Sequence, residues 1–163
     1  MAFSFSSCSF ADGDTVSLKH VFGGFGCTGQ NASPELHWSG APAGTKSFVI
    51  TVYDPDAPTG SGWWHWTVIN IPADATSIPE GASHPGKSGL PAGAVEGRTD
   101  FGMPGFGGPC PPEGDKPHRY IFTLHAVKEE SLPLNGESPG AQVGYYLNFA
   151  TIEKASFTVF YGR

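Results

Sequence analysis

Lys46–Pro72 reads KSFVITVYDPDAPTGSGWWHWTVINIP and contains two apolar runs separated by turn residues. Lys46–Tyr53 is apolar on both faces, which is typical of a central strand buried on both sides. Trp64–Pro72 has the same character, and the Pro and Gly residues between the two runs predict a turn. If the two strands form a hairpin, the acidic DPD segment and the histidine of WWHW lie at the same end of a sheet.

The remaining elements are also mostly strands. The sequence predicts one helix near 138–150, with Ser138 as its N-cap and Pro139 at the first helical position. Its apolar stripe would use Tyr145, Leu147, Phe149 and Ile152. Together these elements predict one mainly β domain, 1–163, built from antiparallel strands. The further strands are expected at Asp14–Phe22, Glu35–Gly40, His118–Lys128 and Ala155–Gly162.

The connection Ala73–Pro117 is long for a compact domain, and loops of this length are usually functional. We expect a short strand inside its segment GAVEGR (93–98). Two phosphate-binding patterns also occur in loops, GASHPGKS (81–88) and GFGCTG (24–29). Both lack the following helix whose N-terminus would hold a phosphate, so we read them as turns.

Charge and composition exclude several classes of protein. The formal net charge of −6 and the lack of a basic stripe exclude a nucleic-acid binder. No apolar run approaches the length of a membrane span. The N-terminus MAFSFSSCSFADGD has neither a basic region nor a continuous apolar region, so we expect a cytoplasmic protein without a signal peptide. A secreted form whose signal was removed stays open.

The three cysteines are Cys8, Cys27 and Cys110, and no two of them have the C-x-x-C spacing of zinc or redox motifs. Three reduced thiols are the first expectation, because cytosolic cysteines are usually reduced. A bridge between Cys27 and Cys110 is the alternative, because both lie in loops rich in Gly and Pro.

Polar side chains gather at the predicted strand ends. Asp54 and Asp56 follow the strand that ends at Tyr53, and His65 begins the next strand beside three of the four tryptophans. His118 begins a later strand, and Tyr120 lies on the same face as His118. Around one depression, the histidines and the tyrosine hydroxyl would suit phosphate or carboxylate oxygens, and a carboxylate would orient an imidazole and favour its protonated form. In this hypothesis His65 is a donor held in place by Asp54.

DPDAP, WWHW and GPCPPEGDKPHRYIF together strongly resemble the phosphatidylethanolamine-binding protein family, in particular its bacterial and archaeal Raf-kinase-inhibitor-like branch. The resemblance covers nearly the whole chain. It implies two antiparallel sheets in a Greek-key sandwich with a few short helices, and no cofactor or metal. It also implies a candidate cis bond between Ala57 and Pro58. The anion pocket that it implies uses Asp54, His65, His118 and Tyr120, with Pro58 and Trp63 as walls and Cys110 through its backbone. We add Asp56 and Pro111 to these candidate ligand-binding residues.

The resemblance implies a binding protein for a phosphoryl or carboxylate head group that modulates a kinase or protease partner. A homodimer is a further expectation from related bacterial proteins. The alternative is a hydrolase, with or without a metal, in which Asp54 or Asp56 works with His65 and His118 as acid and base. No activated nucleophile is evident, so we expect that the protein is not an enzyme.

Overall fold

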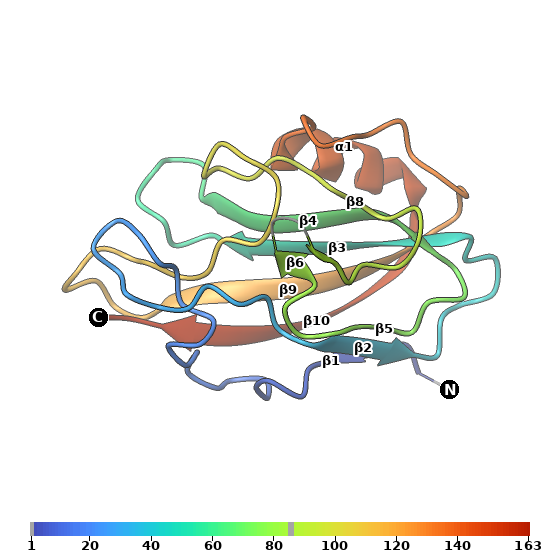
Figure 1. The fold of residues 1–163 in the computed structure, drawn as a ribbon. Helices are drawn as coiled ribbons and strands as arrows, with labels where there is room; N and C mark the ends of the chain where they lie inside the picture. Colours follow the sequence, from blue (N-terminus) through green and yellow to red (C-terminus); the bar gives the residue numbers. More distant parts are fainter. Residues whose placement is uncertain (1, 85–86) are drawn as a thin grey trace.

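The computed structural model describes residues 2–84 and 87–163, and its strands form two main antiparallel sheets (Figure 1). The five-stranded sheet has the order β10-β9-β3-β4-β8, and the three-stranded sheet has the order β1-β2-β5. A further hairpin pairs β6 with β7. The elements are β1 Ser4–Ser6, β2 Leu36–Ser39, β3 Ser47–Asp54, β4 Trp63–Pro72, β5 Ser77–Ile78, β6 Ser83–His84, β7 Lys87–Ser88, β8 Val95–Glu96, β9 His118–Val127, α1 Gly140–Ala150 and β10 Thr151–Tyr161.

The large sheet has Greek-key connectivity. β3, β4 and β8 lie side by side in the sheet and follow this order along the chain, with β5, β6 and β7 in the connection from β4 to β8. β9 then returns to pair with β3 on its other side. This is the order 4-1-2-3 that defines the motif. The prediction of a mainly β Greek-key fold with two antiparallel sheets is confirmed, and β3 is the central strand expected from its apolar sequence.

The central strand β3 is buried on both faces because different layers cover them. Phe48, Ile50 and Val52 point into a core shared with the small sheet. Val49 points to the opposite face and packs with residues of α1 such as Val143. Figure 1 shows the resulting layers, with α1 above the large sheet and β1, β2 and β5 below it.

Two predictions about the helix are corrected. Pro139, not Ser138, is the N-cap residue, and the Ser138 hydroxyl instead accepts a hydrogen bond from the backbone N–H of Asn135. The face toward the sheet is formed by small and aliphatic residues, because Trp64 and the strands approach closely. Tyr145, Phe149 and Ile152 are exposed, and only Leu147 of the predicted stripe is buried. The buried residues of α1 are Gly140, Val143, Leu147 and Ala150.

The strand predicted at Asp14–Phe22 is wrong. Its first residues bridge to β10 at Phe160, and after Val16 the backbone closes two turns with bonds of 3.0 and 3.3 Å from His20 and Val21 to the carbonyls of Ser17 and Leu18. A polar alternation alone cannot distinguish such a segment from an edge strand. The short strand expected within 93–98 is confirmed as β8.

The two phosphate-binding patterns lie in turns. No helix follows 81–88: β6 and β7 come from this segment, and its residues Pro85 and Gly86 lie outside the described part of the chain. In the second pattern, Gly26 has a φ of +85°, a conformation that favours glycine. Within residues 2–84 and 87–163, no helix has the length and apolar character needed to cross a bilayer.

Two glycines of α1 give a matched test of how the helix packs. A Cβ at Gly140 would overlap the indole of Trp64, whereas a Cβ at Gly144 would meet no neighbouring atom. We expect Gly140→Ala to lower the free energy of unfolding by about 1–3 kcal/mol. Gly144→Ala should raise it by about 0.5–1 kcal/mol, because alanine favours the helix. Urea unfolding of both variants checks this, and a Gly140→Ala variant as stable as the parent would contradict the packing.

Candidate functional site: a pocket where three strands end

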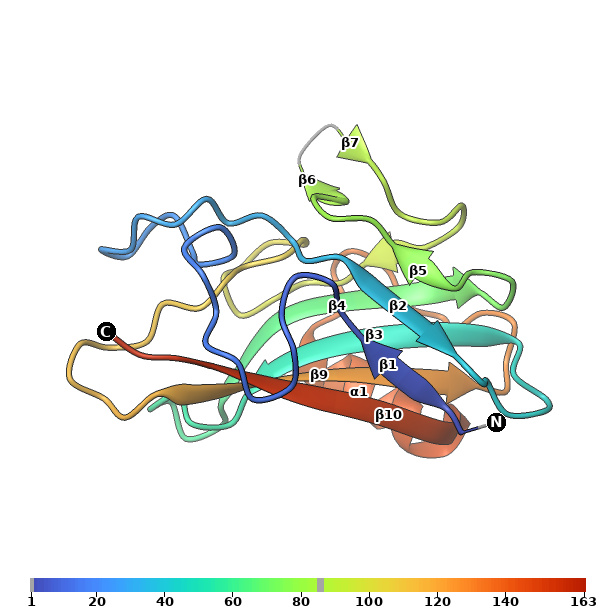
Figure 2. The same ribbon diagram turned by 90° about the horizontal axis from the view of Figure 1, so that it is seen from below.

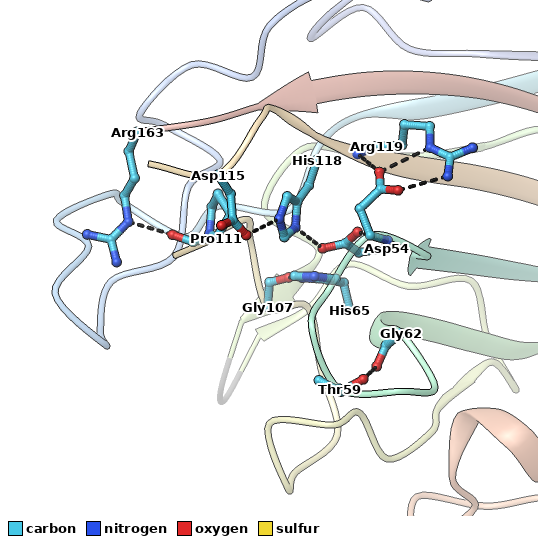
Figure 3. A network of polar contacts seen from close by, with 11 residues as sticks. Asp54, Thr59, Gly62, His65, Gly107, Pro111, Asp115, His118, Arg119 and Arg163 are labelled. Atoms are coloured by element: carbon cyan, nitrogen blue, oxygen red, sulfur yellow. Dashed lines mark hydrogen bonds and ion pairs between the residues drawn. The ribbon is translucent and has the colours of Figure 1, made fainter. Parts of the chain in front are cut away.

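Three adjacent strands of the large sheet bring the polar side chains together. Asp54 ends β3 and pairs in register with Trp63, the first residue of β4. On the other side of β3 lies β9, which begins at His118. The turn between β3 and β4 is closed by a hydrogen bond of 2.6 Å from the Thr59 hydroxyl to the Gly62 carbonyl (Figure 3). The hairpin therefore fixes Asp54, Trp63 and His118 at one end of the sheet, as the sequence predicts.

His118 lies between two carboxylates. Its Nδ1 is 2.7 Å from Oδ2 of Asp54, and its Nε2 is 2.9 Å from Oδ2 of Asp115, as Figure 3 shows. Both His118 and Asp54 are only 3% exposed. Asp54 is therefore the partner of His118 and not of His65, which corrects the pairing expected from the sequence.

Burial and pairing act in opposite directions on His118. Burial disfavours the charged ring, but the hydrogen bonds and charges of Asp54 and Asp115 outweigh it and raise the pKa of His118. For Asp54, burial is the largest cause and raises the pKa of the carboxyl above its usual range, while the bond to His118 opposes the shift. Both ring nitrogens face carboxylate oxygens, and both can donate only when the ring is protonated, so the geometry favours an imidazolium.

His65 is a different kind of histidine. Its ring is buried, and its Nδ1 lies 2.7 Å from the carbonyl oxygen of Gly107. Burial lowers the pKa of His65 to about 4, so the ring is neutral at pH 7. A neutral ring that donates from Nδ1 to a carbonyl presents Nε2 as an acceptor. The expected contact of His65 with Asp54 is therefore wrong, because Asp54 pairs with His118. The lowered pKa and the contact with Gly107 favour an acceptor role for Nε2 over the donor role expected from the sequence.

A cavity of about 190 Å³ lies at this end of the sheet. His65, His118 and Asp54 contribute polar groups, and so does Tyr120, whose phenol keeps its proton because burial raises its pKa. Eight of the nine predicted site residues line the cavity: Asp54, Pro58, Trp63, His65, Cys110, Pro111, His118 and Tyr120.

Asp56 does not line the cavity. Its carboxylate forms two hydrogen bonds of 2.8 and 3.0 Å with the guanidinium of Arg119 and a third of 2.9 Å with the backbone N–H of that residue. The hydrogen bond to Arg119 is the largest cause that lowers the pKa of Asp56 to about 2. Asp56 therefore braces the start of β9 from outside the cavity. The peptide bond between Ala57 and Pro58 is trans, so the expected cis bond is wrong.

Several residues that line the cavity were not predicted from the sequence, most clearly Phe25 and Phe101, which form its aromatic rim. Phe25 and Phe101 lie in different loops and stack through Phe22, with ring centroids 5.3 and 4.4 Å from its ring. Phe25 is 72% exposed, and its backbone φ of +54° is unusual for a residue other than glycine. No periodicity marks residues in such loops. The further wall residues are Ala57, Thr59 and Pro112.

A disulfide joins the two loops of the rim. Cys27 and Cys110 are bonded, with their Cα atoms 6.0 Å apart, and Cys8 is free and exposed. The expectation of three reduced thiols is therefore wrong, and the alternative bridge is the one that the structure shows. Because Cys110 lines the cavity and Cys27 follows Phe25 by two residues, the bond joins the loop of Phe25 to the cavity wall at Cys110.

The buried neutral histidines make the fold sensitive to acid. His65 titrates near 6.5 in the unfolded chain but near 4 in the folded one, so the unfolded state binds more protons between these values. We expect His65 to reduce the free energy of unfolding by roughly 2 kcal/mol as the pH falls from 7.5 to 5. His118 has the opposite sign, but its contribution is already complete below pH 6.5, because its pKa is raised.

Urea unfolding at pH 7.5 and 5 measures this loss. His65→Gln should lose less stability over the interval than the parent protein. His125 provides a second case, because burial also lowers its pKa to about 4 on the other face of the sheet. Equal losses in the parent, in His65→Gln and in His125→Gln would contradict the assignment of neutral rings.

The family model for phosphatidylethanolamine-binding protein matches residues 6–162. The protein YbcL of Escherichia coli K12 is 56% identical over 160 residues, which are 98% of this chain and 87% of that protein. YbhB of the same organism is 49% identical over 92% of this chain and 94% of its own length. Both are described only as UPF0098 proteins.

Solved structures show the same relationship. The crystal structure of E. coli YbcL, described as a new member of the mammalian PEBP family, has a TM-score of 0.97 at 55% identity and covers 100% of this chain and 99% of its own. A homologue from Chlamydia trachomatis, CT736, has a TM-score of 0.82 at 29% identity over 99% of this chain and 98% of its own. The resemblance seen in DPDAP and HRY is thereby confirmed, and the chain belongs to the phosphatidylethanolamine-binding protein family.

Proposed function

We propose that the cavity binds a small phosphoryl or carboxylate head group carried by a small molecule. The observation that carries this proposal is the convergence of His65, Tyr120 and the Asp54–His118 pair inside one cavity with apolar walls. A few polar groups in an apolar hollow are the usual form of a small-molecule site. At about 190 Å³ the cavity is smaller than the roughly 300–1,000 Å³ of sites for drug-sized ligands, so it suits a head group alone.

The protonation of the pocket favours a singly protonated anion. The Tyr120 hydroxyl can donate to one ligand oxygen, while the free Nε2 of neutral His65 can accept a hydrogen bond from a P–OH or a carboxylic O–H. One imidazolium faces two carboxylates, so the cluster around His118 has an excess of negative charge. A fully ionised phosphate would be repelled by this negative charge, because the described residues that line the pocket offer no further cationic side chain to balance it.

A regulatory role is the second part of the proposal. Modulation of a kinase or protease partner, and formation of a homodimer, are supported only by the family resemblance. A ligand in the cavity would alter the exposed rim formed by Phe25 and its neighbours, and a partner protein would bind this altered surface. A cytoplasmic location stays a prediction. A persistent disulfide is rare in the cytoplasm. Counting the free thiols of protein trapped directly in cells therefore tests whether the bridge between Cys27 and Cys110 forms there, and with it the predicted location.

Calorimetry with inorganic phosphate at pH 6 tests the pocket. We expect His65→Ala to weaken binding about tenfold, since it removes one hydrogen bond to the ligand. His118→Gln should weaken it as well, because Asp54 and Tyr120 lose their packing partner. His125→Ala is the matched control, a histidine of the same strand β9 whose ring lies outside the cavity. An unchanged affinity in His65→Ala, with the fold intact by circular dichroism, would show that the pocket is assigned wrongly.

Asp115 gives a test with the opposite sign. Its carboxylate is bonded to Nε2 of His118, where it uses the second N–H of the imidazolium. Asp115→Asn removes a negative charge beside the pocket, and we expect three- to tenfold tighter phosphate binding, roughly 1 kcal/mol. Glu113→Gln removes the same charge from a nearby exposed side chain that contacts Arg163. If both variants gained equally, the effect would be general charge and not the contact with His118.

A further inference from the structure

The outer face of the small sheet presents a second cluster of reactive side chains. Along β1 and β2, alternate residues point away from the core, and Phe5, Leu36 and Trp38 are the buried members. Ser6 pairs in register with His37, so both lie on the outer face. Glu35 lies two residues before His37 and Cys8 lies two residues after Ser6, which extends the same face. Figure 2, seen from below, shows β1 and β2 in front of the large sheet.

Three donor atoms of different chemistry converge there. Nδ1 of His37 lies 3.0 and 3.1 Å from the two carboxylate oxygens of Glu35 and 4.0 Å from Sγ of Cys8. One ligand atom from each residue lies within 4.8 Å of the other two. The backbone N–H of Cys8 donates to Oε1 of Glu35 over 2.7 Å, which fixes the carboxylate beside the thiol.

We propose that Cys8, Glu35 and His37 form a binding site for a divalent transition metal ion, with Zn²⁺ as the favoured occupant. Thiolate, imidazole and carboxylate are the three side-chain ligands that zinc uses in proteins. Three protein ligands leave the fourth tetrahedral position to water. No residue of this cluster lines the cavity between the strand ends, so the site is separate from the proposed head-group pocket.

The geometry is close to that of a tetrahedral zinc centre. Bond lengths of about 2.0–2.3 Å place neighbouring ligand atoms about 3.4–3.6 Å apart. The distance from Nδ1 to the carboxylate is slightly shorter than this and the distance from Nδ1 to Sγ slightly longer, so shifts of about half an ångström would complete the site. Cys8 is exposed, and the His37 side chain is 43% exposed, so a metal ion can reach both from solvent.

The hydroxyl of Ser6 gives an independent reason to assign Nδ1 as the ligand atom. It lies 2.9 Å from Nε2 of His37 and can accept the proton of that nitrogen. A metal-bound histidine usually donates its other N–H in this way, which fixes the tautomer and the orientation of the ring. A simple surface ion pair between Glu35 and His37 would not require the Ser6 hydroxyl or the Cys8 thiol beside the ring, so these two contacts favour a metal site over an ion pair.

The test uses the full chain without a histidine tag and with the disulfide intact. Calorimetry with Zn²⁺ should show one equivalent bound, and Co²⁺ should give the absorption bands of a tetrahedral thiolate complex. Cys8 is the one free cysteine in the described chain, so the sulfur-to-metal band reports on this site alone. Bound Zn²⁺ should also slow alkylation of Cys8.

Four variants separate a built site from adventitious binding. Cys8→Ser should abolish the thiolate band and weaken Zn²⁺ binding at least tenfold, and His37→Gln should weaken it to a similar extent. Ser6→Ala should weaken binding by about tenfold or more while the ligands remain. Glu130→Gln, which removes an exposed carboxylate after β9, is the control and should bind as the parent does. Binding that is weak in the parent, or equal in Cys8→Ser and the parent, would overturn the proposal.

Discussion

The ion pair between Asp54 and His118 is the interaction on which the arrangement of the pocket depends. Both side chains are 3% exposed, and the 2.7 Å contact joins the end of β3 to the start of β9. A buried charge is stable only when it is paired, so replacing either residue would leave the other as an unpaired buried charge and destabilise the fold. The pairing follows from the Greek-key return of β9 to the side of β3, which places these two strand ends together.

Because of this pairing, His118 and His65 have different roles in the pocket. Because Asp54 and Asp115 occupy both nitrogens of His118, this ring serves as a charged structural centre. His65 is held by a neutral carbonyl and therefore stays uncharged, with Nε2 left as an acceptor. The pocket thus combines an acceptor, the Tyr120 donor and an apolar wall, which is a better match for a protonated head group than for a fully ionised one.

The sequence was sufficient for β3, β4 and β9 and for most of the residues that line the cavity, because DPD, WWHW and HRY lie at the ends of strongly apolar runs. It could not show that Asp54 pairs with His118, since that depends on which strand lies beside β3. Phe25 and Phe101 were missed because loop residues have no periodicity, although pairing of Cys27 with Cys110 would have pointed to the loop of Phe25. The strand expected at Asp14–Phe22 failed because turns took up its backbone hydrogen bonds.

The most direct measurement is ¹⁵N NMR of the histidine side chains at pH 7, with and without phosphate. We predict that His65 is neutral with its proton on Nδ1, that His118 carries protons on both nitrogens, and that phosphate shifts the Nε2 resonance of His65 while the ring of His125 is unaffected. A charged His65, a neutral His118, or an Nε2 resonance of His65 that does not respond to phosphate would contradict it.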